Sequence, residues 1–200
     1  MRRNIRCLAL LLPLCLLCGC GGREAARSEA IRAHYGALTQ YEAEVRLVLP
    51  RGEESFRCAL HVSGDAAGAE ASVLEPETLR GVSARWEEST LTLRSGSTVL
   101  DAGSLTPSVS AVNAVPLIVR AAAEGYVTAY SEEELGGVPA LRVETELAHA
   151  GTTLCCTAWF GEDDALLYAE LAENDKIIVF AEFTAFTFSA ILEAENEEIG

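Results

Sequence analysis

The strict alternation of apolar and polar residues from Tyr41 to Leu49 is the feature that most constrains the fold of this chain. Apolar side chains occupy every second position, and charged side chains fill most of the positions between them. Successive side chains of a β-strand point to opposite faces, so the pattern predicts a strand with one face in a core and the other in water. The alternation repeats over residues 56–62, and residues 50–53, Pro-Arg-Gly-Glu, predict the hairpin turn between the two strands.

Further segments of the same kind follow in two groups. The later group alternates most clearly over residues 140–148, where most apolar residues are followed by a charged one. Acidic and amide residues at 163–164 and 173–175 mark the hairpin turns of this group. The predicted strands after the first hairpin are residues 69–74, 82–86, 90–94, 98–100, 127–130, 140–148, 154–160, 165–173 and 176–188.

Two segments break this pattern and predict helices. Residues 24–40 are rich in Ala, Glu and Arg, and their small and apolar side chains are spaced along one face. Residues 113–124 are apolar without alternation, which favours a second helix. Asn113 is placed to cap this helix, Pro116 fits its first turn, and Gly125 is placed to end it.

This order of elements predicts an α+β fold. We expect one large curved antiparallel sheet of about ten strands, with an N-terminal helix and a second helix covering the concave face. Two helices cannot easily cover so many strands, so an open apolar groove or cavity is expected. Two interpretations fit the late phenylalanines Phe180, Phe183, Phe186 and Phe188: lining of a lipid site, and ordinary core packing, which is favoured. The side chains expected to line the cavity are Leu47, Phe56, Leu60, Leu117, Val143, Phe160 and Phe183.

The N-terminus has the pattern of a secretory signal. Three arginines precede an apolar run over residues 8–17, which is much shorter than the roughly 20 residues of a membrane-spanning helix. Residues 17–20, Leu-Cys-Gly-Cys, resemble the lipobox of bacterial lipoproteins, which implies cleavage before Cys20, diacylation of Cys20, and anchoring at the extracytoplasmic face of the cell membrane. An ordinary secretory signal is the alternative. The expected organisation is a signal peptide at 1–19, a lipidated tether at 20–24, a folded domain at 25–190 and an acidic tail at 191–200.

Three cysteines besides Cys20 would remain after cleavage: Cys58, Cys155 and Cys156. A disulfide between Cys58 and one of the adjacent pair, with Cys156 as the candidate, fits an exported protein. Three buried free thiols fit about equally well, because cysteine packs as a small hydrophobe. No Cys-x-x-Cys motif and no histidine cluster accompanies them, so the sequence indicates no zinc site.

Composition and missing motifs argue against nucleic-acid binding and against catalysis. The chain has 30 acidic and 15 basic residues and a net charge of -15, whereas nucleic-acid binders carry a basic surplus. His34, His61 and His149 are isolated, and no Gly-x-Ser-x-Gly, His-Glu-x-x-His or Walker motif occurs. The acid clusters at 132–134 and 193–198 match no calcium loop and indicate a solvated turn and a solvated tail. We therefore expect a non-enzymatic protein without a metal or cofactor.

Four segments, at residues 76–82, 99–103, 159–161 and 167–170, together resemble the LolA/LolB-like family, which carries and receives lipoproteins, and the RseB-type sensors of the same fold. Residues 76–82 are similar to a family segment that joins two strands, and residues 99–103 to the strand end that follows it. Residues 159–161, Trp-Phe-Gly, and residues 167–170 are similar to a late hairpin of the family. The resemblance implies an N-terminal helix, an eleven-stranded half-barrel, and further helices plugging the concave side.

The resemblance also implies a function. The first hypothesis is a membrane-anchored protein that holds an acyl chain, or a lipidated partner, in its half-barrel. The layout is also similar to GerS-type lipoproteins of spore-forming bacteria, which implies instead a scaffold that binds and regulates an envelope or spore-cortex hydrolase during germination. The expected partners are the membrane through Cys20, a lipid or lipoprotein ligand, and an envelope protein.

Overall fold

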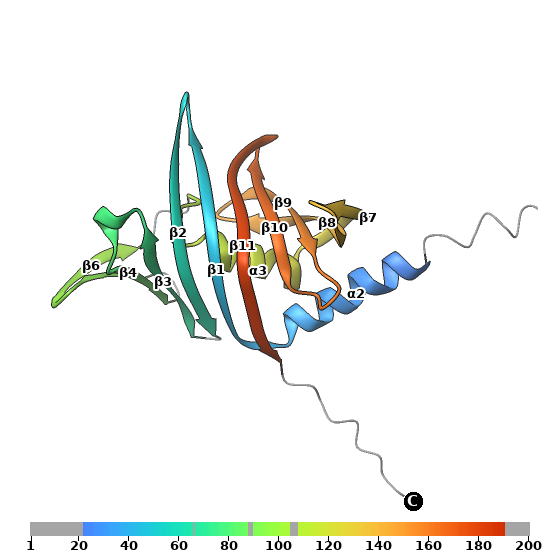
Figure 1. The fold of residues 1–200 in the computed structure, drawn as a ribbon, viewed down its shortest axis with the longest axis horizontal. Coiled ribbons are helices and arrows are strands. Elements are labelled where there is room, and N and C mark those ends of the chain that lie inside the picture. Colours follow the sequence, from blue (N-terminus) through green and yellow to red (C-terminus); the bar gives the residue numbers. More distant parts are fainter. Residues whose placement is uncertain (1–21, 66, 88–89, 105–107, 191–200) are drawn as a thin grey trace, which may run out of the picture.

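The computed structural model describes residues 22–65, 67–87, 90–104 and 108–190 (Figure 1). The predicted signal peptide, Cys20 and the acidic tail lie outside the described residues. Within them, the chain forms two α-helices, one short 3₁₀ helix and eleven strands. These elements are α2 (Gly22–Gly36), β1 (Leu38–Arg51), β2 (Glu54–Asp65), β3 (Gly68–Glu75), η2 (Glu77–Leu79), β4 (Val82–Glu87), β5 (Thr90–Ser95), β6 (Thr98–Ser104), α3 (Ala114–Glu124), β7 (Tyr126–Leu135), β8 (Val138–His149), β9 (Thr152–Phe160), β10 (Leu166–Glu173) and β11 (Lys176–Ala190).

All eleven strands belong to one antiparallel sheet, in the order β6-β5-β4-β3-β2-β1-β11-β10-β9-β8-β7. Two meanders meet where the first and last strands pair, so that Val45 lies between Leu60 of β2 and Phe183 of β11. Among the described residues, β6 and β7 end the sheet and do not pair with each other. The sheet is therefore a half-barrel, and the predicted α+β class with a large curved antiparallel sheet is confirmed.

Alternation along each strand separates a buried inner face from an outer face in water. In β1 the apolar residues from Tyr41 to Leu49 are buried, whereas the charged residues between them are exposed. In β2 the inner face carries Cys58 and the outer face carries His61, because residues an odd number of positions apart in a strand point to opposite faces. Register shifts in the β1–β11 and β7–β8 pairs mark bulges, which increase the local twist of the sheet.

Both helices pack on the inner face, mainly over the half of the sheet formed by β7 to β10. Helix α3 is apolar, and Val115, Leu117 and Ile118 are completely buried. Helix α2 packs against α3 and against β7 and β8, and its Tyr35 hydroxyl donates a hydrogen bond to the backbone oxygen of Asp164 at 3.0 Å. Neither helix of the described part has the length and hydropathy that a membrane crossing needs.

Three local predictions differ from the structure. The first helix ends at Gly36, and the last three residues of its predicted range belong to β1. Asn113 stands at the start of α3, but its side-chain oxygen accepts from the backbone N–H of Ser110 at 2.7 Å rather than from the helix. The acid cluster at 132–134 lies in β7 rather than in a turn, which is tolerated because an edge strand leaves charged side chains in water.

Gly125 follows α3 as predicted. Glycine is required there by close packing and not by an unusual backbone angle. Its N–H donates to the backbone oxygen of Ala121 at 2.9 Å, which closes the last turn. A Cβ at this position would meet that same oxygen and would lie 2.8 Å from the Cβ of Thr145 on β8. Because Gly125 has no side chain, the chain can pass from the end of α3 directly into β7.

Candidate functional site

We call strands β2 to β6 the wing. Their inner face is the part of the sheet that the two helices leave least covered. Figure 1 shows β3, β4 and β6 projecting to one side, whereas α2 lies at the opposite side of the molecule. Side chains of the wing surround a hollow of about 110 Å³. Its lining is apolar except for Ser83. The principal lining residues are Phe56, Cys58 and Leu60 of β2, Ala71 and Val73 of β3, Leu79 of η2, Val82 and Ala84 of β4, and Leu93 of β5.

Two large side chains of this hollow remain exposed to water. Phe56 is 36% exposed and Leu79 is 40% exposed, although both belong to the lining. Contiguous exposed apolar side chains are uncommon on monomeric proteins and mark interaction sites. The hollow is therefore an open apolar groove rather than part of the closed core.

A second hollow, of about 420 Å³, lies next to the first along β3 and β4. Ala69 and Trp86 face each other at the second hollow, and the next inner pair along the ladder, Ala71 and Ala84, lines the first. Helix α3 forms the opposite wall of the second hollow, where Arg120 supplies a charged group. The two hollows thus run in tandem from an apolar end in the wing to a more polar end beside α3.

Tyr41 closes one side of the second hollow. Its ring packs over Gly64 of β2, where a Cβ would collide with the phenol. Burial, with a smaller effect of the nearby Asp65 carboxylate, raises the pKa of Tyr41 above its usual value of 10.0. The phenol is therefore neutral at physiological pH and offers an uncharged wall.

The described residues beneath the helices pack more closely than those of the wing. Between α2 and strands β8 and β9, the remaining gap is only about 10 Å³ and is lined by residues that include Ile31, Val143 and Phe160. The aromatic rings of Tyr35 and Phe160 are in edge contact there, with centroids 5.4 Å apart. This half of the concave face is a packed core.

The predicted lining residues divide accordingly between groove and core. Phe56 and Leu60 line the hollow of the wing, whereas Val143 and Phe160 line only the small gap beneath α2. Leu47, Leu117 and Phe183 are buried in the core. The sequence analysis missed the wing residues Val73, Leu79, Val82, Ala84 and Leu93, which lie in or beside predicted strands whose alternation was visible.

The predicted disulfide between Cys58 and Cys156 is not formed. All three cysteines of the described residues are free thiols. Strands β1, β11 and β10 lie between β2 and β9, so four strand spacings of about 4.8 Å separate the two strands along the sheet, far more than a disulfide spans. The alternative of three buried thiols is wrong for Cys155, which is exposed on the outer face.

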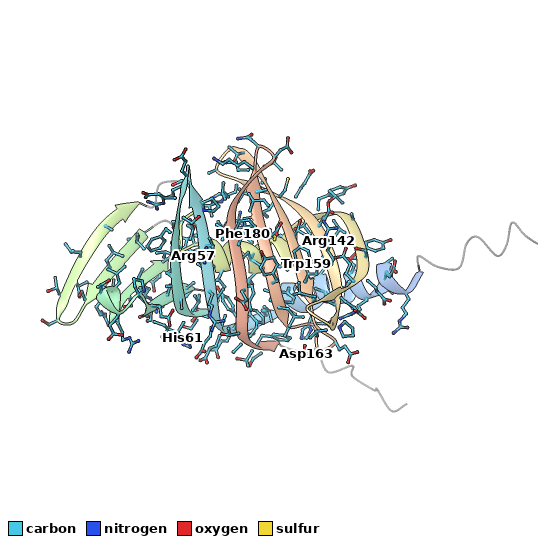
Figure 2. All side chains as sticks on the ribbon, turned by 45° about the horizontal axis from the view of Figure 1, so that its top comes forward. Arg57, His61, Arg142, Trp159, Asp163 and Phe180 are labelled. Atoms are coloured by element: carbon cyan, nitrogen blue, oxygen red, sulfur yellow. The ribbon has the colours of Figure 1, made fainter. Side chains whose placement is uncertain are left out.

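The outer face carries a second cluster of distinctive side chains, labelled in part in Figure 2. Trp159 of β9 lies between Arg142 and Tyr168: the guanidinium carbon is 5.6 Å from its ring centroid, and the tyrosine ring is 5.4 Å away. Its indole N–H donates to the Oε2 atom of Glu133 at 3.1 Å. This bond and one from Ser131 lower the pKa of the Glu133 carboxyl, which keeps it ionised beside Arg142.

A shallow hollow of about 500 Å³ continues this outer cluster across the middle of the sheet. Phe180 of β11 lies in it opposite Val48 of β1, and Arg57 of β2 lies opposite Val48 on the other side. Arg46 pairs with Glu182 at 3.7 Å in the adjacent row. The outer face therefore combines aromatic rings with arginines in a central position.

Within the described residues, the structure brings no set of metal-binding side chains together. No cluster of three His, Cys, Asp or Glu side chains there has the arrangement of a metal site. His34 stacks edge-on against Phe188 with ring centroids 4.5 Å apart, His61 is on the outer face of β2, and His149 ends β8. The three histidines lie on different elements.

Comparisons with known proteins find similar solved structures but no family. No protein-family model and no curated protein matches the chain. An uncharacterized conserved protein from Thermus thermophilus is 13% identical, with a TM-score of 0.48, over 86% of this chain and 91% of that one.

Two further structures are similar at a comparable level. A LolA superfamily protein from Nitrosomonas europaea is 9% identical, with a TM-score of 0.41, over 82% of this chain and 94% of that one. The lipoprotein LppX from Mycobacterium tuberculosis is 16% identical, with a TM-score of 0.41, over 84% of this chain and 90% of that one. These likenesses concern the fold alone.

Proposed function

We propose that this protein binds the hydrocarbon portion of a lipid, or of a lipidated partner, in the open groove of the wing. The observation that carries the proposal is the apolar hollow whose lining residues Phe56 and Leu79 remain exposed. Each methylene transferred from water to such a surface contributes about 0.8 kcal/mol. An acyl chain would therefore gain several kcal/mol by covering side chains that now contact water.

The size and polarity of the two hollows support an amphiphilic ligand. Together they fall in the range of 300–1,000 Å³ that is typical of small-molecule sites. Polar groups gather at the end beside α3, where Gln40, Arg120 and Glu124 contribute to the lining. We propose that the chain of the ligand occupies the wing and that its polar end faces α3.

A matched pair of substitutions tests this site. Ala84→Phe adds an aromatic ring to β4 inside the hollow, and Ala59→Phe adds the same ring on the outer face of β2, two strands away. We expect Ala84→Phe to weaken uptake of a fluorescent fatty acid at least about tenfold, because the ring occupies the space of the chain. Ala59→Phe should bind the probe like the unmodified protein.

Native mass spectrometry supplies a second measurement. The unmodified protein purified from cells should carry an extra mass that matches a lipid, and Ala84→Phe should lose it. Equal probe binding by both variants, together with the absence of any bound mass, would contradict the proposal.

We further propose that the protein is attached to the extracytoplasmic face of the membrane through a lipid on Cys20. The lipobox-like residues 17–20 support this anchor. Helix α2 begins at Gly22, two positions after Cys20, so the folded part starts beside the proposed lipid. This arrangement and the groove are together what the LolA/LolB-like resemblance implies.

The outer face favours a second candidate function, a scaffold that binds an envelope or spore-cortex hydrolase. The cluster contains Trp159, Tyr168, Phe180 and nearby arginines, and these residue types are enriched at protein interfaces. Phe180→Ala should then abolish recovery of such a hydrolase while leaving probe uptake unchanged. Recovery that is unaffected by Phe180→Ala would count against this candidate.

A further inference from the structure

Strand β6 is an open edge of the sheet. Among the described residues it pairs only with β5, so the backbone N–H and C=O groups along its other side have no strand partner there. An edge of this kind is a template for another strand.

The two edges of the sheet differ in how they are protected. Strand β7 carries three consecutive glutamates and packs against α2. Strand β6 carries a single charged residue, Asp101, and its apolar side chains are exposed on both faces. Val99 is 56% exposed on the outer face and Leu100 is 61% exposed on the inner face.

We propose that β6 pairs antiparallel with β6 of a second copy of this chain, around a twofold axis perpendicular to the sheet at Leu100. Such an axis keeps the inner faces of both copies on the same side, so facing residues must belong to the same face. A register centred on Asp101 would oppose two carboxylates. The register centred on Leu100 instead sets Leu100 against Leu100 and Asp101 against Val99 of the second copy.

Charge complementarity supports this register. Arg94 lies opposite Val99 in the β5–β6 pair and therefore shares its outer face. In the described part of the chain, no carboxylate pairs with its guanidinium. Two strand spacings, about 10 Å, would separate the backbones of Arg94 and Asp101 of the second copy, which their side chains can span across Val99. The twofold axis makes this ion pair occur twice.

The pairing has a defined strength and a structural consequence. One short strand pair buries less than the roughly 1,200 Å² of a standard interface, so the dimer should be weak and concentration-dependent. It would join the two wings edge to edge and make their inner faces continuous. The proposal does not depend on lipid binding, because β6 adjoins the groove without forming its lining.

Sedimentation of the full chain in a density-matched detergent tests the pairing. We expect the protein to shift from monomer to dimer between about 10 µM and about 1 mM. Arg94→Asp and Asp101→Arg should each weaken self-association about tenfold, because two attractive pairs become repulsive. An equimolar mixture of the two variants should regain wild-type association, since each then supplies the charge that the other needs.

Controls separate this interface from general effects on folding. Leu100→Lys, which places two ammonium groups at the axis, should abolish the dimer, and Val138→Lys at the exposed start of β8 should leave it unchanged. All substituted side chains are exposed, so the circular dichroism spectra should match. A protein that remains monomeric throughout this range, or a single charge variant that associates like the wild type, would overturn the proposal.

Discussion

Individual residues show how little space the covered half of the molecule leaves for change. Gly125 lies where the backbone of α3 and the side chain of Thr145 meet, and its missing Cβ is the reason that they approach so closely. The thiol of Cys156 is buried nearby, and its neighbour Thr145 is also buried. Substitutions here act on the packed core rather than on the groove.

Gly125→Ala should lower the free energy of unfolding by about 1–3 kcal/mol, because the added methyl group collides with the Ala121 carbonyl and the Thr145 side chain. Gly36→Ala is the matched control, since a Cβ there meets no atom within 4 Å. The control should be neutral or stabilising by about 0.5–1 kcal/mol. Urea unfolding of both variants measures these changes, and equal losses in both would refute the packing argument.

The buried thiols predict how stability responds to alkaline pH. Burial raises the pKa of Cys58 from 9.0 to about 11 and that of Cys156 to about 12. Below about pH 9 both states keep these thiols protonated, so no stability is lost there. Above it the unfolded chain releases protons that the folded chain retains, and stability falls as pH rises.

Cys156→Ala should remove one thiol whose proton binding differs between the folded and unfolded states. The slope of unfolding free energy against pH between 9 and about 11 should become shallower than that of the wild type, by at most about 1.4 kcal/mol per pH unit. Denaturant titrations at several pH values provide the measurement. Parallel slopes for the two proteins would show that the Cys156 thiol ionises as readily in the folded state as in the unfolded state.

The strands of the sheet differ in how deeply they are buried. Strand β1 has five buried residues, from Tyr41 to Leu49, whereas β4 has only Ala84 and β5 has none in the described part. Buried apolar contacts and paired neighbours protect backbone hydrogen bonds from opening. The wing is therefore the less stable end of the same sheet.

Amide hydrogen exchange should show this gradient directly. Amides of β4 and β5 should exchange at least about tenfold faster than those of β1 and β10, because fewer buried contacts oppose their opening. A lipid that fills the groove should slow exchange in β3 to β5 and leave β8 unchanged. Uniform protection along the sheet without ligand would contradict the gradient.

Period-two alternation predicted the presence of the strands and the faces on which their side chains lie, although it did not extend the predicted strand at 127–130 over the charged residues 132–134 of β7. It was insufficient for the groove, because parity shows which side chains point inward but not which strands the helices cover. Val143 and Val82 both lie on inner faces, yet only Val82 lies in the part that α2 and α3 leave open. The pairing of Cys58 also failed because strand order places β1, β11 and β10 between the two thiols.

At the scale of the whole molecule, the net negative charge of the protein opposes attachment to a membrane. Loss of Arg2, Arg3 and Arg6 with a signal peptide would change the net charge from -15 to -18. An anionic membrane surface repels such a protein. Attachment would then depend on the acyl chains proposed for Cys20 rather than on the protein surface.

Cys20→Ser in the full chain should therefore release the protein from the membrane fraction and abolish incorporation of a labelled fatty acid. Cys18→Ser is the matched control, because the residues before Cys18 are both leucine and do not resemble a lipobox. That variant should remain in the membrane pellet. Retention of both variants to the same extent would contradict acylation of Cys20.

The pairing of the first strand with the last imposes an order on biosynthesis. Thr184 of β11 donates a hydrogen bond to the backbone oxygen of Glu44, a residue 140 positions earlier. The ribosome therefore synthesises β1 long before its neighbour β11. One edge of β1 stays unpaired until β11 has been made. Non-local pairing of this kind slows folding and leaves strand edges exposed to aggregation. Premature termination before β11 would leave β1 to β6 with a second open edge, at the centre of what should be one sheet.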